Sequence, residues 1–131
     1  MRIEHGKIVE FARAVHDVCP SYRAEGAPVA PPTFLMTIAH WIRDLGDTRP
    51  GVTLDVRRLL HGEQEFEYLR PVRAGDVLRF RSRTKDVFEK QGKRGGVMTF
   101  VVGETEFRDP EGVPVAYMRN TVIETADAVK E

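Results

Sequence analysis

The stretch that decides the fold is TFLMTIAHWIRDLG, residues 33–46. It follows two prolines, and Thr33 is placed to cap a helix that begins after Pro32. Apolar side chains cover more of this helix than a solvent-facing helix would carry, namely Phe34, Leu35, Ile38, Trp41, Ile42 and Leu45. The pattern predicts a mostly buried helix, and Gly46 can supply the left-handed residue that ends it.

An amphipathic helix is predicted upstream of this stretch. Apolar residues recur there at the spacing of one helical stripe, at Ile8, Phe11, Ala12 and Val15. We expect a helix from about His5 to Val18, ended by Pro20. The next dozen residues, SYRAEGAPVAPP, contain three prolines and a glycine, which is typical of a loop.

From Leu59 onward the apolar period changes to about two, and β-branched and aromatic residues become frequent. Four antiparallel strands are therefore predicted, over residues 59–69, 76–88, 97–109 and 113–124. The last two are joined by DPEG, whose Pro and Gly suit a tight reversal. Glu63, Glu65 and Glu67 share one strand face, which we expect to be solvated, and the C-terminal ADAVKE is expected to fray.

A helix that is apolar nearly all round needs a surface that wraps it. A curved antiparallel sheet folded around the helix provides one, which is the α+β arrangement called the hotdog fold. Two helices lying flat on one face of a sheet would satisfy the same periodicity, and the pattern alone does not separate the two. The 131 residues, 41% of them hydrophobic, are enough to bury one core, so residues 1–131 are expected to form a single domain.

The composition argues against several classes of partner. Twenty basic residues balance twenty acidic ones, so no net field draws the chain to nucleic acid or to an anionic membrane. The first residues are too charged for a signal peptide, and no apolar run is long enough to span a bilayer, which favours a cytoplasmic protein. The single cysteine, Cys19, forms no internal disulfide and cannot anchor a zinc site alone. No metal or other cofactor is expected.

Three segments together resemble the MaoC-like dehydratase N-terminal family. They are KIVEFARAV at residues 7–15, APPTFLMTIAHW at 30–41 and HGEQEFEYLRPVRAGDVL at 61–78. That family includes the substrate-binding subunits of two-component (3R)-hydroxyacyl-thioester dehydratases. The resemblance implies a hotdog fold, an acyl thioester carried on coenzyme A or acyl carrier protein (ACP), and assembly into dimers of hotdogs.

The segment HDVCPSY, residues 16–22, resembles an active-site motif in which two residues are replaced. Catalytic relatives carry the form DxNPxH, in which an Asp and a His share the proton transfers of hydration. Here Asp17 and Pro20 are kept, but Cys19 stands in place of the Asn and Tyr22 in place of the His. A phenol with a pKa near ~10 is a poor base at neutral pH. Only Asp17 is left as a residual catalytic candidate.

The resemblance also implies that backbone N–H groups at the start of the buried helix meet the charge on the thioester carbonyl. Pro31 and Pro32 have no N–H there, which leaves Thr33 and Phe34 as donors. With Tyr22 and His61, these two are the expected substrate-binding residues. Each also has a plain structural explanation, such as core packing or a strand-edge histidine held by the backbone.

These observations predict a non-catalytic, acyl-thioester-binding subunit of a heteromeric (R)-specific enoyl hydratase or 3-hydroxyacyl dehydratase. A catalytic MaoC-like hotdog partner would supply the intact Asp and His. Three alternatives stay open. The chain could be a homodimeric hydratase in which Asp17 works with Tyr22 or His61, a hotdog thioesterase, or an acyl-binding or scaffold protein without turnover.

Overall fold

A computed structural model describes residues 1–42, 49–92 and 96–126. The chain divides into two compact units. The first, called unit 1, comprises Met1–Ile42, Phe66–Arg81 and Glu106–Tyr117. The second, called unit 2, comprises Arg43–Glu65, Ser82–Thr105 and Met118–Glu131.

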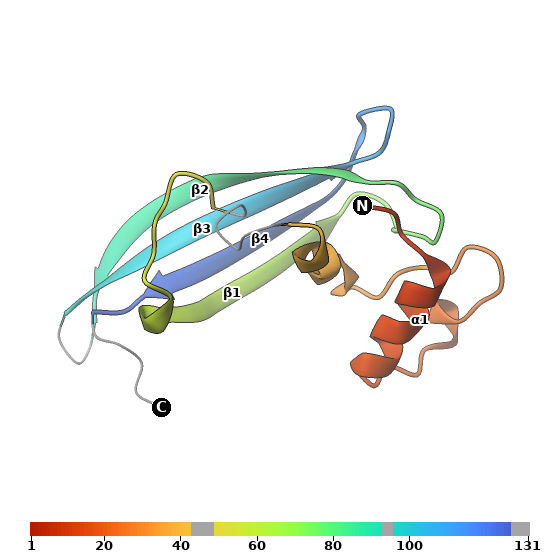
Figure 1. Cartoon of the computed structure of the whole chain (residues 1–131), viewed down its shortest axis with the longest axis horizontal. Coiled ribbons are helices and arrows are strands. Elements are labelled where there is room, and N and C mark those ends of the chain that lie inside the picture. The colour runs from red at the N-terminus through yellow and green to blue at the C-terminus, as the bar shows by residue number, and fades with distance from the viewer. Residues whose placement is uncertain (43–48, 93–95, 127–131) are drawn as a thin grey trace. The chain divides into compact units, whose positions relative to one another are not determined.

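Four strands form one sheet in the order β1-β4-β3-β2 (Figure 1). Their bounds are Leu59–Tyr68 for β1, Arg79–Gln91 for β2, Val97–Arg108 for β3 and Pro114–Glu124 for β4. The four predicted strands are thus confirmed to within about three residues at each end. The alternation is confirmed as well: on β1, Phe66 and Tyr68 are half-buried while Glu65 and Glu67 are exposed.

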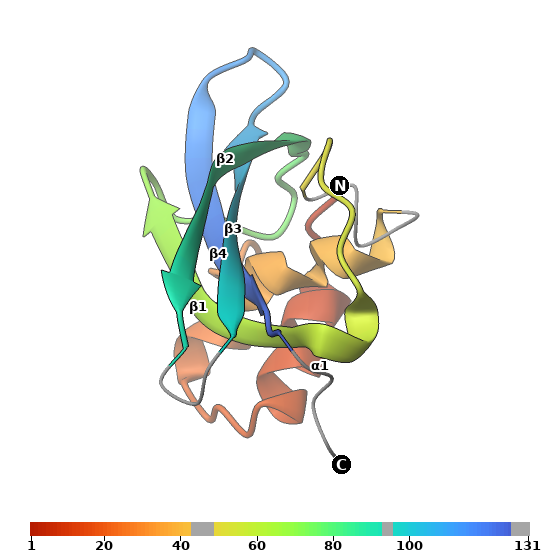
Figure 2. The same cartoon turned by 90° about the vertical axis from the view of Figure 1, so that its left-hand side faces the viewer.

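The predicted reversal at DPEG joins β3 to β4 as a hairpin (Figure 2). The carboxylate of Asp109 accepts the N–H of Val113 at 2.8 Å, and the Asp109 carbonyl accepts the N–H of Gly112 at 3.0 Å. Gly112 has a φ of +88°, a conformation that glycine adopts without steric cost. The turn residues therefore set the register of this hairpin.

Unit 1 contains α1, His5–Ala14, and a core of fully buried apolar side chains. The larger members of this core are Ile3, Ile8, Phe34, Leu35, Val72, Leu78, Phe107 and Val115. The extended N-terminus is tied to the segment before β2, because Ile3 N–H donates to the Asp76 carbonyl and Leu78 N–H to the Met1 carbonyl, both at 2.8 Å. The prediction that the first helix reaches Val18 is wrong, since α1 ends four residues earlier and before Pro20.

The predicted buried helix is present but differs in form. It is a 3₁₀ helix, η2, over Phe34–His40, and the Thr33 side chain makes no capping hydrogen bond. Its hydrogen bonds close over three residues, as in Met36 N–H to the Thr33 carbonyl at 3.0 Å. Phe34, Leu35 and Ile38 are buried, but Met36 and Trp41 are 40% and 54% exposed, so the expectation of a mostly buried helix is wrong on that face. Leu45 and Gly46 lie outside the described residues.

Unit 2 has a smaller apolar core. Val101, Met118 and Val122 are buried on β3 and β4, and Phe88 stacks on Phe100 with ring centroids 5.0 Å apart. A short 3₁₀ helix, η4, spans Val56–Arg58. The carboxylate of Asp55 accepts the Arg57 N–H at its start.

Candidate functional site

Residues 16–22 begin where the backbone leaves α1. His16 has a φ of +56°, and its N–H donates to the Arg13 carbonyl while Asp17 N–H donates to the Ala12 carbonyl. These two hydrogen bonds are those of a Schellman motif, in which the residue after the helix adopts the left-handed conformation. Asp17 is thereby directed out of the helix.

We expect His16→Gly to raise the free energy of unfolding by about 0.5–1 kcal/mol, because a Cβ is unfavourable at positive φ. Urea-induced unfolding measures the change. Arg13→Gly is the matched control on the same helix, and it should lose about 1 kcal/mol because residue 13 is helical. Equal destabilisation by both variants would contradict a left-handed role for His16.

Asp17 and Tyr22 flank a turn that leads into a short 3₁₀ helix. One carboxylate oxygen of Asp17 accepts the Cys19 N–H at 2.9 Å, within the turn that precedes η1, Pro20–Tyr22. Desolvation, and then the charges of Asp17 and Cys19, raise the pKa of the Tyr22 phenol. A raised pKa moves Tyr22 further from service as a base at pH 7. In the described residues of unit 1, no histidine is hydrogen-bonded to Asp17.

The two predicted backbone donors are not both available. The Phe34 N–H donates to the Pro31 carbonyl at 2.9 Å, so the expectation that it is free for a thioester carbonyl is wrong. Its side chain is only 2% exposed and packs edge-on against Phe11, with ring centroids 5.5 Å apart. Thr33 is exposed. The carbonyl of Pro32 accepts the Tyr68 hydroxyl at 2.7 Å, which ties this segment to β1.

His61 belongs to unit 2. Its side chain is exposed near the start of β1, and its Nε2 lies 3.4 Å from the Gln64 side-chain oxygen. That contact is on its own strand. The role of His61 in binding a substrate therefore remains a sequence-based prediction.

A pocket of about 480 Å³ in unit 1, called here the α1–η2 pocket, is lined by residues of α1, of η2 and of the N-terminal segment. Its apolar wall includes Phe11, Phe34 and Trp41. Thr37 also lines it, and the Thr37 hydroxyl is buried without a hydrogen-bond partner in the described part of the chain. Of the predicted site residues, Phe34 alone lines this pocket. No single stretch of the sequence indicated this pocket, because residues from three separate segments line it.

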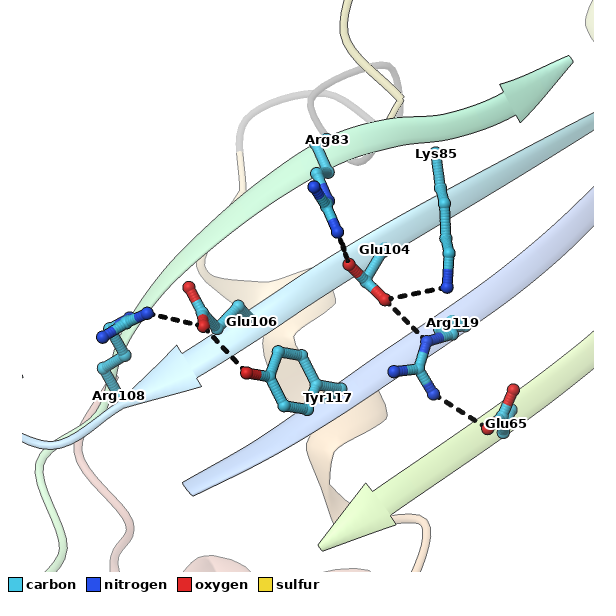
Figure 3. Close-up of polar contacts among 8 residues, drawn as sticks. All are labelled: Glu65, Arg83, Lys85, Glu104, Glu106, Arg108, Tyr117 and Arg119. Atoms are coloured by element: carbon cyan, nitrogen blue, oxygen red, sulfur yellow. Dashed lines mark hydrogen bonds and ion pairs between the residues drawn. The ribbon is translucent and has the colours of Figure 1, made fainter. Parts of the chain in front are cut away.

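In unit 2, an array of opposite charges, called here the charge ladder, runs across the sheet (Figure 3). Glu104 on β3 accepts the Arg83 guanidinium on β2 and the Arg119 guanidinium on β4, both at 2.6 Å, and Lys85 at 3.4 Å. Arg119 also donates to Glu65 on β1 at 2.8 Å. Three cations thus surround one carboxylate whose side chain is 5% exposed.

The ladder controls the ionisation of its central acid. Burial acts to raise the pKa of Glu104, but hydrogen bonds from Arg119, Arg83 and Lys85 outweigh burial and lower the pKa from 4.5 to about 2. Such a carboxylate stays ionised at neutral pH and is unsuited to proton transfer there. We interpret the ladder as structural. Sequence reasoning predicted a solvated face for Glu63, Glu65 and Glu67, which are exposed, but not the buried Glu104 between them and β2.

Among the described residues, no group of three or more His, Cys, Asp or Glu side chains is arranged to hold a metal ion. No helix within those same residues has the length and apolar character needed to span a membrane.

The four-stranded antiparallel sheet and its short helices define a hotdog fold, which solved structures of dehydratases share. The chain belongs to the family described as FAS1-like, dehydratase domain region, whose model matches residues 1–118. It is also 34% identical over 125 residues to a UPF0336 protein of Saccharopolyspora erythraea, a match that covers 89% of this chain and 77% of that protein. It spans about half the length of other curated relatives that it matches.

Two solved structures are similar across nearly the whole chain. The C-terminally truncated HadBC complex, a (3R)-hydroxyacyl-ACP dehydratase of Mycobacterium tuberculosis, matches with a TM-score of 0.74 at 25% identity, over 94% of this chain and 88% of that one. A MaoC-like dehydratase matches with a TM-score of 0.76 at 26% identity, over 95% of this chain and 38% of that one. These matches confirm the predicted family and fold.

Proposed function

We propose that this chain is a non-catalytic, acyl-thioester-binding subunit of a heteromeric (R)-specific enoyl-CoA or enoyl-ACP hydratase, or of the corresponding 3-hydroxyacyl dehydratase. One observation carries the proposal. Where catalytic relatives place a histidine beside the motif aspartate, this chain has Tyr22, and its surroundings raise the pKa of the phenol.

The replacement of histidine by Tyr22 matters because the reaction depends on proton transfer. Adding water across an α,β double bond requires one group that handles the proton at the α carbon and one that activates the water. Tyr22 with a raised pKa stays protonated at pH 7, and one oxygen of Asp17 already accepts the Cys19 N–H. The occupied Phe34 N–H removes a further donor that could stabilise an enolate. All three features favour binding over catalysis.

A partner subunit follows from the same reasoning, because a half-complete site needs a second chain to supply the missing acid and base. The similarity to HadBC supports this step, since that dehydratase is described as a complex. We infer that the partner of this chain is a hotdog dehydratase subunit with an intact Asp and His. The shared ligand would be an acyl group on coenzyme A or ACP.

The test is hydration of crotonyl coenzyme A, followed as loss of enoyl absorbance, by the purified chain and by the complex that co-purifies with it from the native host. We expect activity in the complex only, and Asp17→Asn in this chain should change the rate of the complex by less than twofold. A hundredfold loss would instead show that Asp17 is catalytic.

The assay also separates the alternatives. Hydration by the lone chain, abolished by Asp17→Asn, would identify a stand-alone hydratase. Release of free thiol from acyl coenzyme A would identify a thioesterase. Binding without turnover in any complex would leave an acyl-binding or scaffold protein.

A further inference from the structure

The Pro-rich segment that leads into η2 is held by the turn RPVRAGD, residues 70–76. Ala30 N–H donates to the Val72 carbonyl at 2.7 Å, and Ala74 N–H donates to the Pro28 carbonyl at 3.0 Å. These two hydrogen bonds, one in each direction, form a short antiparallel bridge. Since all of these residues belong to unit 1, the chain enters η2 from a fixed place in that unit.

The Pro-rich segment ends in a tight turn over residues 31–34. The Phe34 N–H donates to the Pro31 carbonyl at 2.9 Å, and Thr33 has a φ of −102° and a ψ of 5°. These are features of a type I β-turn, with Pro32 at the position where proline is favoured. Such a turn uses its first carbonyl and its last N–H. The carbonyl and the N–H of its central peptide, which joins Pro32 to Thr33, are left over.

Tyr68 binds one of these two groups. Its hydroxyl donates to the Pro32 carbonyl at 2.7 Å from the end of β1. Burial raises the pKa of Tyr68 to about 12, so the hydroxyl keeps its proton at neutral pH and remains a donor. The other group, the Thr33 N–H, makes no hydrogen bond within the described residues, and Thr33 is exposed. The central peptide is therefore fixed at its carbonyl and has a donor to offer at its N–H.

The geometry of the peptide bond couples these two groups. The bond is planar and trans, so its carbonyl and its N–H point in opposite directions. Rotating this peptide by about half a turn converts a type I turn into a type II turn and directs the N–H to the opposite side. The hydrogen bond from Tyr68 opposes this rotation. Thr33 opposes it as well, because a type II turn requires a positive φ at its position.

We propose that Tyr68 is a positioning residue for the ligand: through the Pro32 carbonyl, it orients the Thr33 N–H towards the carbonyl oxygen of the acyl thioester. The hydrogen bond that the Pro32 carbonyl accepts also polarises the peptide, which makes the Thr33 N–H a stronger donor. This inference deepens the proposed function and rests on it. It gives Tyr68 and the RPVRAGD turn one shared role, since both hold the segment that ends at Thr33.

The first test removes the Tyr68 hydroxyl. Binding of octanoyl coenzyme A to the purified chain is measured by isothermal titration calorimetry, and we expect Tyr68→Phe to weaken it about fivefold to tenfold. Tyr117→Phe is the matched control in unit 1, because the Tyr117 hydroxyl donates to Glu106 of β3 at 3.1 Å, and it should bind within twofold of the unmodified chain. Equal affinities of the three proteins, or no binding by the unmodified chain, would overturn the role of Tyr68.

The amide proton of Thr33 distinguishes positioning from a purely structural role. In NMR spectra of the nitrogen-labelled chain, a hydrogen bond donated to the ligand moves the resonance of this proton downfield. We expect saturating octanoyl coenzyme A to cause this shift in the unmodified chain and in Tyr117→Phe, and less than half of it in Tyr68→Phe. A lower thermal midpoint of Tyr68→Phe together with the full shift at saturation would show that the hydroxyl is only structural.

A further variant tests the rotation of the peptide. Thr33→Gly keeps the N–H but permits the positive φ of a type II turn. Tyr68→Phe should therefore weaken binding by a larger factor in the Thr33→Gly chain than in the unmodified chain. An equal or smaller factor would contradict orientation of the peptide by Tyr68.

Failure of the positioning role and failure of the proposed function give different results. If the co-purified complex hydrates crotonyl coenzyme A but Tyr68→Phe binds octanoyl coenzyme A as tightly as the unmodified chain, the role of Tyr68 is wrong and the subunit role stands. If Tyr68→Phe and the Thr33 amide proton behave as expected but no complex shows hydration, the role of Tyr68 stands and the dehydratase role is wrong.

Discussion

Replacing Glu104 by Gln is expected to lower the free energy of unfolding by about 2–3 kcal/mol at pH 7. The carboxylate is 5% exposed and accepts hydrogen bonds from Arg83, Arg119 and Lys85. A glutamine keeps the size of the side chain but leaves three neighbouring cations without their shared anion. Urea-induced unfolding of the purified chain measures the loss.

The pH dependence of this effect has a definite sign. The folded-state pKa of Glu104, about 2, lies below the ordinary 4.5, so its contribution is fully present above 4.5 and is lost as the pH falls towards 2. The gap in stability between the unmodified chain and Glu104→Gln should therefore narrow between pH 5 and pH 2. A gap that stays constant over this range would contradict the interpretation of the ladder.

Glu65→Gln is the matched control at the outer end of the same ladder. Glu65 pairs with Arg119, but its side chain is 55% exposed and solvent screens the pair. We expect a change of at most about 0.5 kcal/mol. A loss as large as that of Glu104→Gln would show that the ladder acts as one unit rather than through its buried centre.

The strands could be predicted from the sequence because burial of one face imposes a period of two that the residues display directly. Phe66 and Tyr68 against Glu65 and Glu67 is one such case. The ladder could not be predicted, because the partners of Glu104 lie 15 to 21 residues away on two other strands. Such pairing depends on strand order, which periodicity does not contain.

The form and the ends of the helical segments could not be predicted from apolar spacing. Apolar spacing identified η2, but it did not distinguish an α-helix from a 3₁₀ helix or reveal the exposure of Trp41. The end of α1 is set by the left-handed His16, a residue type without the usual glycine signal. At the candidate site, the motif frame identified Asp17 and Tyr22, and the roles of these two residues stay predictions. The orphan hydroxyl of Thr37 is a property of three-dimensional packing and had no sequence signal.

Replacing Phe34 by Ala is expected to lower the free energy of unfolding by about 3–4 kcal/mol. The side chain is 2% exposed and packs edge-on against Phe11, so truncation leaves a cavity between η2 and α1. Phe34→Leu fills most of that space and should lose less than about 1.5 kcal/mol. Met36→Ala, at a 40% exposed position on the same helix, should cost much less than Phe34→Ala.

The expected stabilities of the Phe34 variants determine how a change in their ligand binding is interpreted. Phe34 was predicted from the sequence to bind substrate, and in the structure it is a core residue whose ring also forms part of the α1–η2 pocket. Loss of acyl coenzyme A binding by Phe34→Ala could therefore follow from unfolding alone. Phe34→Leu, which should remain folded, separates the two roles. Weaker binding by this folded variant would assign Phe34 to the ligand, whereas unchanged binding would assign it to the core.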